Sequence, residues 1–208
     1  MKRKRSILHP DQRRQQLLEA AIWVFARKGY RNASITDIIA RAGVARGTFY
    51  LYFKSKEQIF LDIVGDFHRR TTQALSGMGD VPDVRAAGDV RGLIAASFRR
   101  WLTFAAANRD AAAVILKEAS SIDARFEKGY ADLRRAAAQH FAVRFRQLQQ
   151  LGLVSTAVSA DLLAHLQLGM FDELLIAFVL RDPETNLDAL ATELADFEWN
   201  GIRPDRKD

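Results

Sequence analysis

A short run of small, polar and aromatic residues near the N-terminus is the part of the sequence best suited to chemistry. Arg46, Gly47 and Thr48 stand together, and Tyr50 and Tyr52 follow them. An arginine fork can bind O6 and N7 of guanine, a glycine lets the backbone approach closely, and tyrosine hydroxyls can bind phosphates. These residue types, in this order, are suited to reading duplex DNA.

Two short helices are expected to position these residues. Ser34 can cap the first helix, and Asp37 stands three residues later, as in a capping box. Gly43 can adopt the positive φ of a tight turn, and Val44 can anchor the second helix in the core. The spacing therefore predicts a helix-turn-helix over about residues 34–53.

The charge is concentrated in the same part of the chain. Residues 1–57 carry 13 Lys and Arg against four acids, whereas the whole chain has a net charge of +6. A basic quarter on a slightly acidic body indicates that this quarter meets a polyanion. Lys56 would add a cation at the start of the next helix, where phosphate is favoured. The segment Lys2–Arg5 is either a solvated tail or an arm that enters the minor groove.

Helical periodicity covers most of the remaining sequence. Helices are predicted over 11–28 and from Lys56 to about Leu75, and the glycines and proline of 76–92 predict a loop. Apolar residues recur at helical spacing beyond it, and alternating valine-rich stretches are absent. We therefore expect an all-α protein, with a three-helix DNA-binding domain over residues 1–57 and a larger helical bundle over 58–208.

Residues 11 to about 62 resemble the DNA-binding domain of the TetR family of transcriptional regulators. The matching segments are Thr36-Asp37-Ile38, Ala42-Gly43-Val44, Gly47-Thr48-Phe49-Tyr50 and Tyr52-Phe53-Lys54-Ser55-Lys56-Glu57. The resemblance implies that DNA is contacted by Thr36, Ala45, Arg46, Gly47, Thr48, Tyr50, Tyr52 and Lys56.

The sequence departs from the family pattern at two positions, and its two tyrosines allow a second interpretation. Ala45 replaces a frequent serine and cannot cap the recognition helix, which costs about 1 kcal/mol. Ile39 replaces a usual alanine and adds bulk between the two helices. Tyr50 and Tyr52 could instead lie at the edge of the core.

The C-terminal part is predicted to form the contact between two copies of the chain. Residues 160–181 are apolar on almost every side, so this helix is covered either by its own domain or by a second subunit. The resemblance implies that 160–181 and 187–199 pair with their mates in a homodimer. Because one short recognition helix covers few base pairs, a symmetric dimer should read a palindromic operator.

A ligand pocket is a further expectation for the second domain. Its aromatic residues either line a cavity or only fill the core. The resemblance implies a repressor that is released by a small hydrophobic effector, without cofactor or metal. The candidate lining residues are Phe98, Trp101, Phe104, Phe126, Tyr130, Phe141 and Phe171.

Other classes of protein are disfavoured by what the sequence lacks. It has no cysteine, so disulfides and thiolate zinc sites are excluded. It has no His-Glu-x-x-His motif and no glycine-rich phosphate loop, which speaks against an enzyme. A purely architectural DNA-binding protein would not need the large aromatic second domain. The longest apolar run, Leu174 to Leu180, is far too short to cross a membrane, and a cytoplasmic protein is expected.

Overall fold

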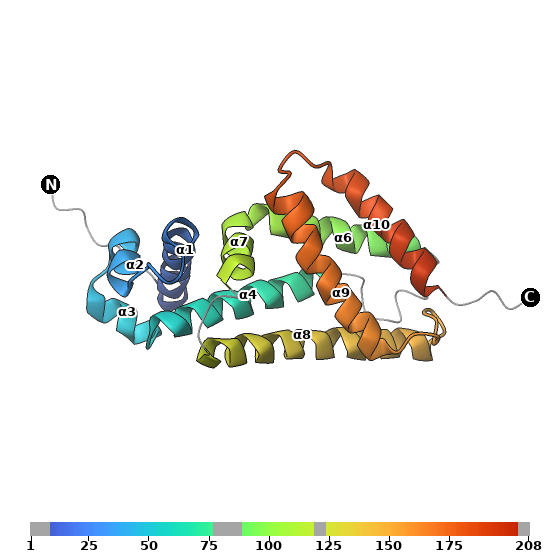
Figure 1. Ribbon diagram of the computed structural model, residues 1–208, viewed down its shortest axis with the longest axis horizontal. Coiled ribbons are helices and arrows are strands. Elements are labelled where there is room, and N and C mark those ends of the chain that lie inside the picture. The colour runs from blue at the N-terminus through green and yellow to red at the C-terminus, as the bar shows by residue number, and fades with distance from the viewer. Residues whose placement is uncertain (1–8, 77–88, 119–123, 204–208) are drawn as a thin grey trace, which may run out of the picture.

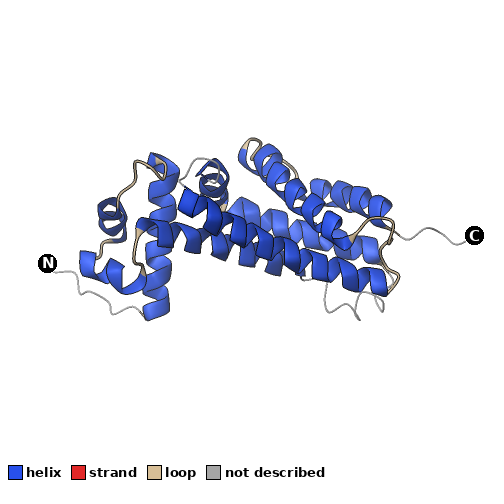
Figure 2. Ribbon diagram, turned by 60° about the horizontal axis from the view of Figure 1, so that its bottom comes forward, coloured by secondary structure: helices blue, strands red, loops and turns tan. Residues whose placement is uncertain are grey.

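The computed structural model describes residues 9–76, 89–118 and 124–203. Within these ranges the chain is helical and contains no strand, which confirms the predicted all-α class (Figure 2). Three helices gather at one end of the molecule and the others form an elongated bundle (Figure 1). The basic segment Lys2–Arg5 lies outside the described residues.

The N-terminal unit consists of α1 (Pro10–Lys28), α2 (Ile35–Ala42) and α3 (Arg46–Tyr52). Their apolar faces meet in a core that contains Phe25, Ile38, Phe49 and Phe53, each at most 1% exposed. Full burial of one such side chain stabilises the fold by about 1.5–3 kcal/mol. This core fixes the orientation of α3 relative to α1 and α2.

Helix α4 (Lys56–Ser76) connects the two parts of the molecule (Figure 1). Its first turns place Ile59 and Phe60, both fully buried, in the N-terminal core. Farther along it packs against α6 (Val90–Ala107) and α8 (Ala124–Gln150). The predicted domain boundary at residue 57 therefore falls at the start of a continuous helix, and it stays a prediction.

The remaining helices complete the bundle. They are α7 (Arg109–Glu118), α9 (Ala160–Leu174), the π-helical turn η1 (Leu175–Leu180) and α10 (Leu187–Ile202). Helix α9 packs along α8, α10 packs along α6, and α7 contacts α1. The bundle therefore touches the N-terminal unit through both α4 and α7.

The segment Ala160–Leu180 is long and apolar enough to cross a membrane by composition alone, with a mean hydropathy of 1.6. In the structure 44% of its most apolar window is buried. It contacts α8, α6 and α7 as an internal helix of the bundle. The fold therefore already accounts for much of its apolar character.

Candidate DNA interface and effector cavity

The turn between α2 and α3 has the predicted construction. Gly43 adopts a φ of 66° in the left-handed region, and the Val44 N–H donates to the carbonyl of Ile39 at 3.1 Å. Phe49 is fully buried and attaches α3 to the core. Ala45 begins α3 without a side-chain cap. The structure thus contains a helix-turn-helix over the predicted residues.

Most of the predicted DNA contacts lie at the surface. Thr36 on α2 is exposed, as are Ala45, Arg46 and Gly47 at the start of α3. Tyr50 is 46% exposed, whereas Thr48 and Tyr52 are half-buried. The fold therefore leaves the start of α3 open to a partner. Whether each residue touches DNA stays a prediction.

Leu51 was missed by the sequence analysis and is 80% exposed. A helix turns by about 100° per residue, so residues two before and two after Phe49 lie on the face opposite to it. Gly47 and Leu51 are these residues. The position of Leu51 relative to Phe49 was the signal that could have identified it.

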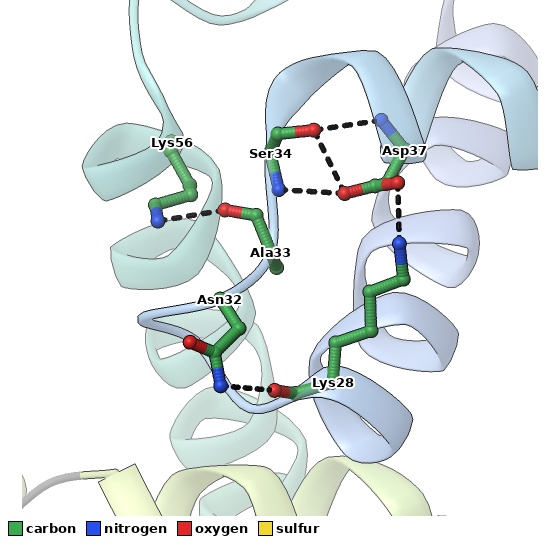
Figure 3. A network of polar contacts seen from close by, with 6 residues as sticks. All are labelled: Lys28, Asn32, Ala33, Ser34, Asp37 and Lys56. Carbon is green, nitrogen blue, oxygen red and sulfur yellow. Dashed lines mark hydrogen bonds and ion pairs between the residues drawn. The ribbon is translucent and has the colours of Figure 1, made fainter.

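The side chain of Lys56, which was predicted to bind a phosphate, forms hydrogen bonds within the protein in this structure (Figure 3). Its ammonium donates to the carbonyl oxygens of Tyr30 and Ala33, both at 2.8 Å, and lies 4.4 Å from the centre of the Tyr30 ring. It thereby ties the loop between α1 and α2 to the first turn of α4. A phosphate contact stays a prediction that would compete with these bonds.

The N-terminus of α2 is held by a second polar network (Figure 3). The Asp37 N–H donates to the Ser34 hydroxyl at 3.1 Å, and the Ser34 N–H donates to the Asp37 carboxylate at 3.0 Å. Lys28 donates to the other carboxylate oxygen of Asp37. Hydrogen bonds from Lys28 and Ser34 lower the pKa of Asp37 to about 2. The predicted capping box is confirmed, with an added link to α1.

A cavity lies in the second domain between α6, α8, α9 and α10. Its volume is about 60 Å³, and it opens partly to solvent. Its walls include three of the predicted residues, which are Phe98, Phe141 and Phe171. Ile94, Phe145 and Leu148 add to the apolar surface. The lining of the cavity is therefore mostly apolar.

The structure places the other predicted pocket residues elsewhere. Trp101 is fully buried and does not line the cavity. The centre of its ring lies 4.5 Å from that of Phe171, which does line it. Phe104 packs against Phe67 at 5.3 Å, on the side of α6 that faces α4. Tyr130 lies beside Arg134 and is not part of the wall. The side chain of Phe126 lies outside the described residues.

The same cavity contains polar groups that the sequence analysis did not assign to it. His140 and Arg144 come from α8, Gln167 from α9 and Glu198 from α10. Burial raises the pKa of Glu198 to about 7, against a hydrogen bond with Gln167 that acts to lower it. These positions are far apart in sequence, so no local motif could have grouped them.

One nitrogen of the Arg144 side chain has no partner in the part of the chain that the structure describes. Its Nη2 atom is buried and has no hydrogen-bond acceptor among the described residues, and burial lowers its pKa. Arg134, on the same helix, instead forms an ion pair with Asp172 at 2.6 Å. A buried donor atom without an acceptor is costly unless a ligand supplies one. Arg144 is thus suited to bind an anionic group inside the cavity.

The outer faces of α9 and α10 present apolar side chains to solvent. Leu162, Leu166 and Phe197 are 51%, 59% and 73% exposed. Leu166 and Phe197 also line a groove between these helices that shares Gln167 and Glu198 with the cavity wall. Such a surface is suited to packing against another protein surface.

The N-terminal segment is similar to known DNA-binding regulators. Residues 17–63 match the family described as "Bacterial regulatory proteins, tetR family". An uncharacterized HTH-type transcriptional regulator, YdgC of Bacillus subtilis, is 44% identical over 57 residues, which are 27% of this chain and 29% of that protein. The alignment with this relative thus spans less than a third of its length.

Two further comparisons cover most of the chain. The fatty acid metabolism regulator protein of Bacillus subtilis is 24% identical over 187 residues, 90% of this chain and 94% of its own. The crystal structure of the regulator FadR from Bacillus subtilis, in complex with stearoyl-CoA, superposes with a TM-score of 0.72 at 23% identity. The superposition covers 91% of this chain and 99% of the FadR chain. This structural likeness shows the fold that the two chains share over the superposed part.

Proposed function

Because the chain belongs to the TetR family of bacterial regulatory proteins, we propose that it is a homodimeric repressor that binds a palindromic operator and leaves it when an acyl effector binds. DNA binding and regulation of transcription are common to the family, so the chain is a transcriptional regulator and not an enzyme. A regulator of this kind works in the cytoplasm, where its DNA lies.

The observation that carries the DNA-binding proposal is the exposed start of α3. Phe49 holds the helix against the core, while Arg46 and Gly47 stand free at the surface. An arginine at this position can bind a guanine edge bidentately. Thr36, Ala45, Thr48, Tyr50 and Tyr52 are proposed to contact the same duplex.

The homodimer is supported by the apolar surface of α9 and α10. Leu162, Leu166 and Phe197 would be buried if two copies packed these helices together in a four-helix contact. The proposed interface coincides with the predicted segments 160–181 and 187–199. Two recognition helices related by a two-fold axis would then read two half-sites about 34–36 Å apart.

The effector is proposed to be a long-chain acyl compound with an anionic group. The lining of the cavity has the apolar character that an acyl chain requires, and the Nη2 atom of Arg144 can donate to a carboxylate or a phosphate. A relative similar over most of the chain is named for fatty acid metabolism, and a solved structure similar over most of the chain has stearoyl-CoA bound. Acyl-CoA esters are therefore the first ligands to test.

The test uses the full-length protein and duplex DNA enriched from a random library. We expect a symmetric motif among the enriched sequences and release of the labelled duplex by stearoyl-CoA. Enrichment of an asymmetric motif, bound by a monomer in sedimentation, would contradict the dimeric operator. Undiminished binding with saturating acyl-CoA esters of several lengths would contradict the acyl effector.

A further inference from the structure

The outward face of α3 carries an apolar side chain that has no role in the fold. Leu51 is 80% exposed, more than any other large hydrophobic residue among those the structure describes. Two copies joined through α9 and α10 would not cover it, because it lies at the opposite end of the molecule (Figure 1). Its exposure leaves it available to a partner outside the chain.

Gly47 adds a second observation on the same face. It lies four residues before Leu51, one helical turn away, and both are opposite the buried Phe49. A Cβ atom built on Gly47 would meet nothing within 4 Å. Since alanine favours a helix more than glycine does, the fold alone would accept alanine here. A glycine at this position leaves room for something outside the protein to approach the backbone.

We propose that Leu51 contacts the 5-methyl group of a thymine in the major groove, and that Gly47 provides the clearance for this contact. The inference rests on the proposed DNA-binding function. Among the four bases, thymine alone presents a methyl group on the major-groove edge. Cytosine has only a hydrogen at the corresponding C5 position, and contact with a donor or acceptor of another base would leave that polar atom without a hydrogen bond. Leu51 would therefore select thymine at one position of the half-site, and Arg46 would select guanine at another.

The surroundings favour DNA over a protein as the partner of this leucine. Arg46 and Lys54 are exposed on and beside the same short helix. The N-terminal quarter carries a strong excess of cations. An apolar contact in the centre of a cationic surface matches the major groove, where a methyl group lies between two rows of phosphates.

The experiment replaces each thymine of an enriched duplex by deoxyuridine, one position at a time. Uracil pairs as thymine does and lacks only the methyl group. For the wild type, we expect one position in each half-site where this change weakens binding about fourfold, which is the value of one buried methyl group. Leu51→Ala should bind thymine and uracil equally at that position and keep its response elsewhere.

A matched variant and a second substitution sharpen the result. Val143, 49% exposed on α8 in the helical bundle, provides the control Val143→Ala, which should keep the wild-type profile. Gly47→Ala should unfold at an equal or higher temperature and yet bind the duplex more weakly. Identical uracil profiles for wild type and Leu51→Ala would overturn the proposal while leaving DNA binding intact. Failure to enrich any duplex would overturn the proposed function as well.

Discussion

The ammonium of Lys56 lies 2.8 Å from the carbonyl oxygen of Ala33, so the first turn of α4 is bonded to the residue that precedes the cap of α2 (Figure 3). The same nitrogen also binds the carbonyl of Tyr30. Because α4 continues into the bundle, this contact is a rigid link between the bundle and the helix-turn-helix. A shift of α4 caused by an effector would be passed on to α2 at this point.

Replacing Lys56 by methionine tests whether this link is structural. The variant keeps most of the length of the side chain but removes the donor from three carbonyl oxygens, those of Tyr30, Arg31 and Ala33. We expect the free energy of unfolding in urea to fall by about 1–2 kcal/mol. Lys54→Met, at an exposed lysine nearby, should leave it unchanged. Unchanged stability, with weaker binding to all duplexes and a flatter salt dependence, would instead support the phosphate contact.

Replacing Arg46 by alanine tests base reading. Arg46 is exposed at the start of α3, and Arg41, exposed in the last turn of α2, supplies the control Arg41→Ala. We expect Arg46→Ala to lose about 1–3 kcal/mol of binding free energy per half-site and to accept any base at one position. Competition between enriched and altered duplexes measures this. The same order of preference in wild type and Arg46→Ala would remove the residue from base reading.

The features that sequence could predict are those fixed within a few residues. The capping box of Ser34 and Asp37 and the left-handed Gly43 follow from local backbone chemistry, and both are present. Three aromatic residues of α6, Phe98, Trp101 and Phe104, were predicted to line a pocket, but the sequence could not predict which of them face it. Phe98 faces the cavity while Phe104 packs on α4, because the direction of each depends on which helices surround α6.

The polar groups of the cavity show most clearly which features the sequence could not predict. Arg144 and Glu198 lie 54 residues apart in a sequence that contains many charged residues. What distinguishes them is burial in one cavity, which arises only when α8 and α10 are packed around it. The burial of these charged groups is a tertiary property, so it could not be read from residue type or spacing.

Replacing Phe197 by glutamate tests the dimer. The side chain is 73% exposed on α10, so the charge should not disturb the fold of one subunit. Buried against a second copy, however, it would place carboxylates in an apolar contact. We expect sedimentation at micromolar concentration to show monomers for Phe197→Glu and dimers for Val143→Glu. A dimer that persists in Phe197→Glu would move the interface away from this part of α10.

The raised pKa of Glu198 predicts a pH-dependent stability. Between its usual pKa of 4.5 and the folded value of about 7, the folded chain keeps a proton that the unfolded chain has lost. The free energy of unfolding should therefore fall as pH rises through this window, by on the order of 1–3 kcal/mol, and level off above it. Glu198→Gln should lack this decline and be the more stable protein at pH 8. Parallel stability curves for the two proteins between pH 5 and 8 would contradict a buried neutral carboxyl.

The last prediction concerns Arg144 as the anion-binding residue of the effector cavity. Arg144→Met keeps most of the apolar volume and removes the charge, so the protein should be at least as stable as the wild type. Its affinity for stearate and stearoyl-CoA should fall at least tenfold, whereas affinity for stearyl alcohol, which has no anionic group, should change little. Arg146→Met, at an exposed neighbour paired with Asp161 at 3.1 Å, is the control and should bind all three as the wild type does.

Operator DNA should weaken stearoyl-CoA binding by the factor with which stearoyl-CoA weakens operator binding, because linkage is reciprocal. Calorimetry with and without operator measures both quantities. Equal loss of all three ligands in Arg144→Met would mean that Arg144 shapes the cavity and does not bind the anion.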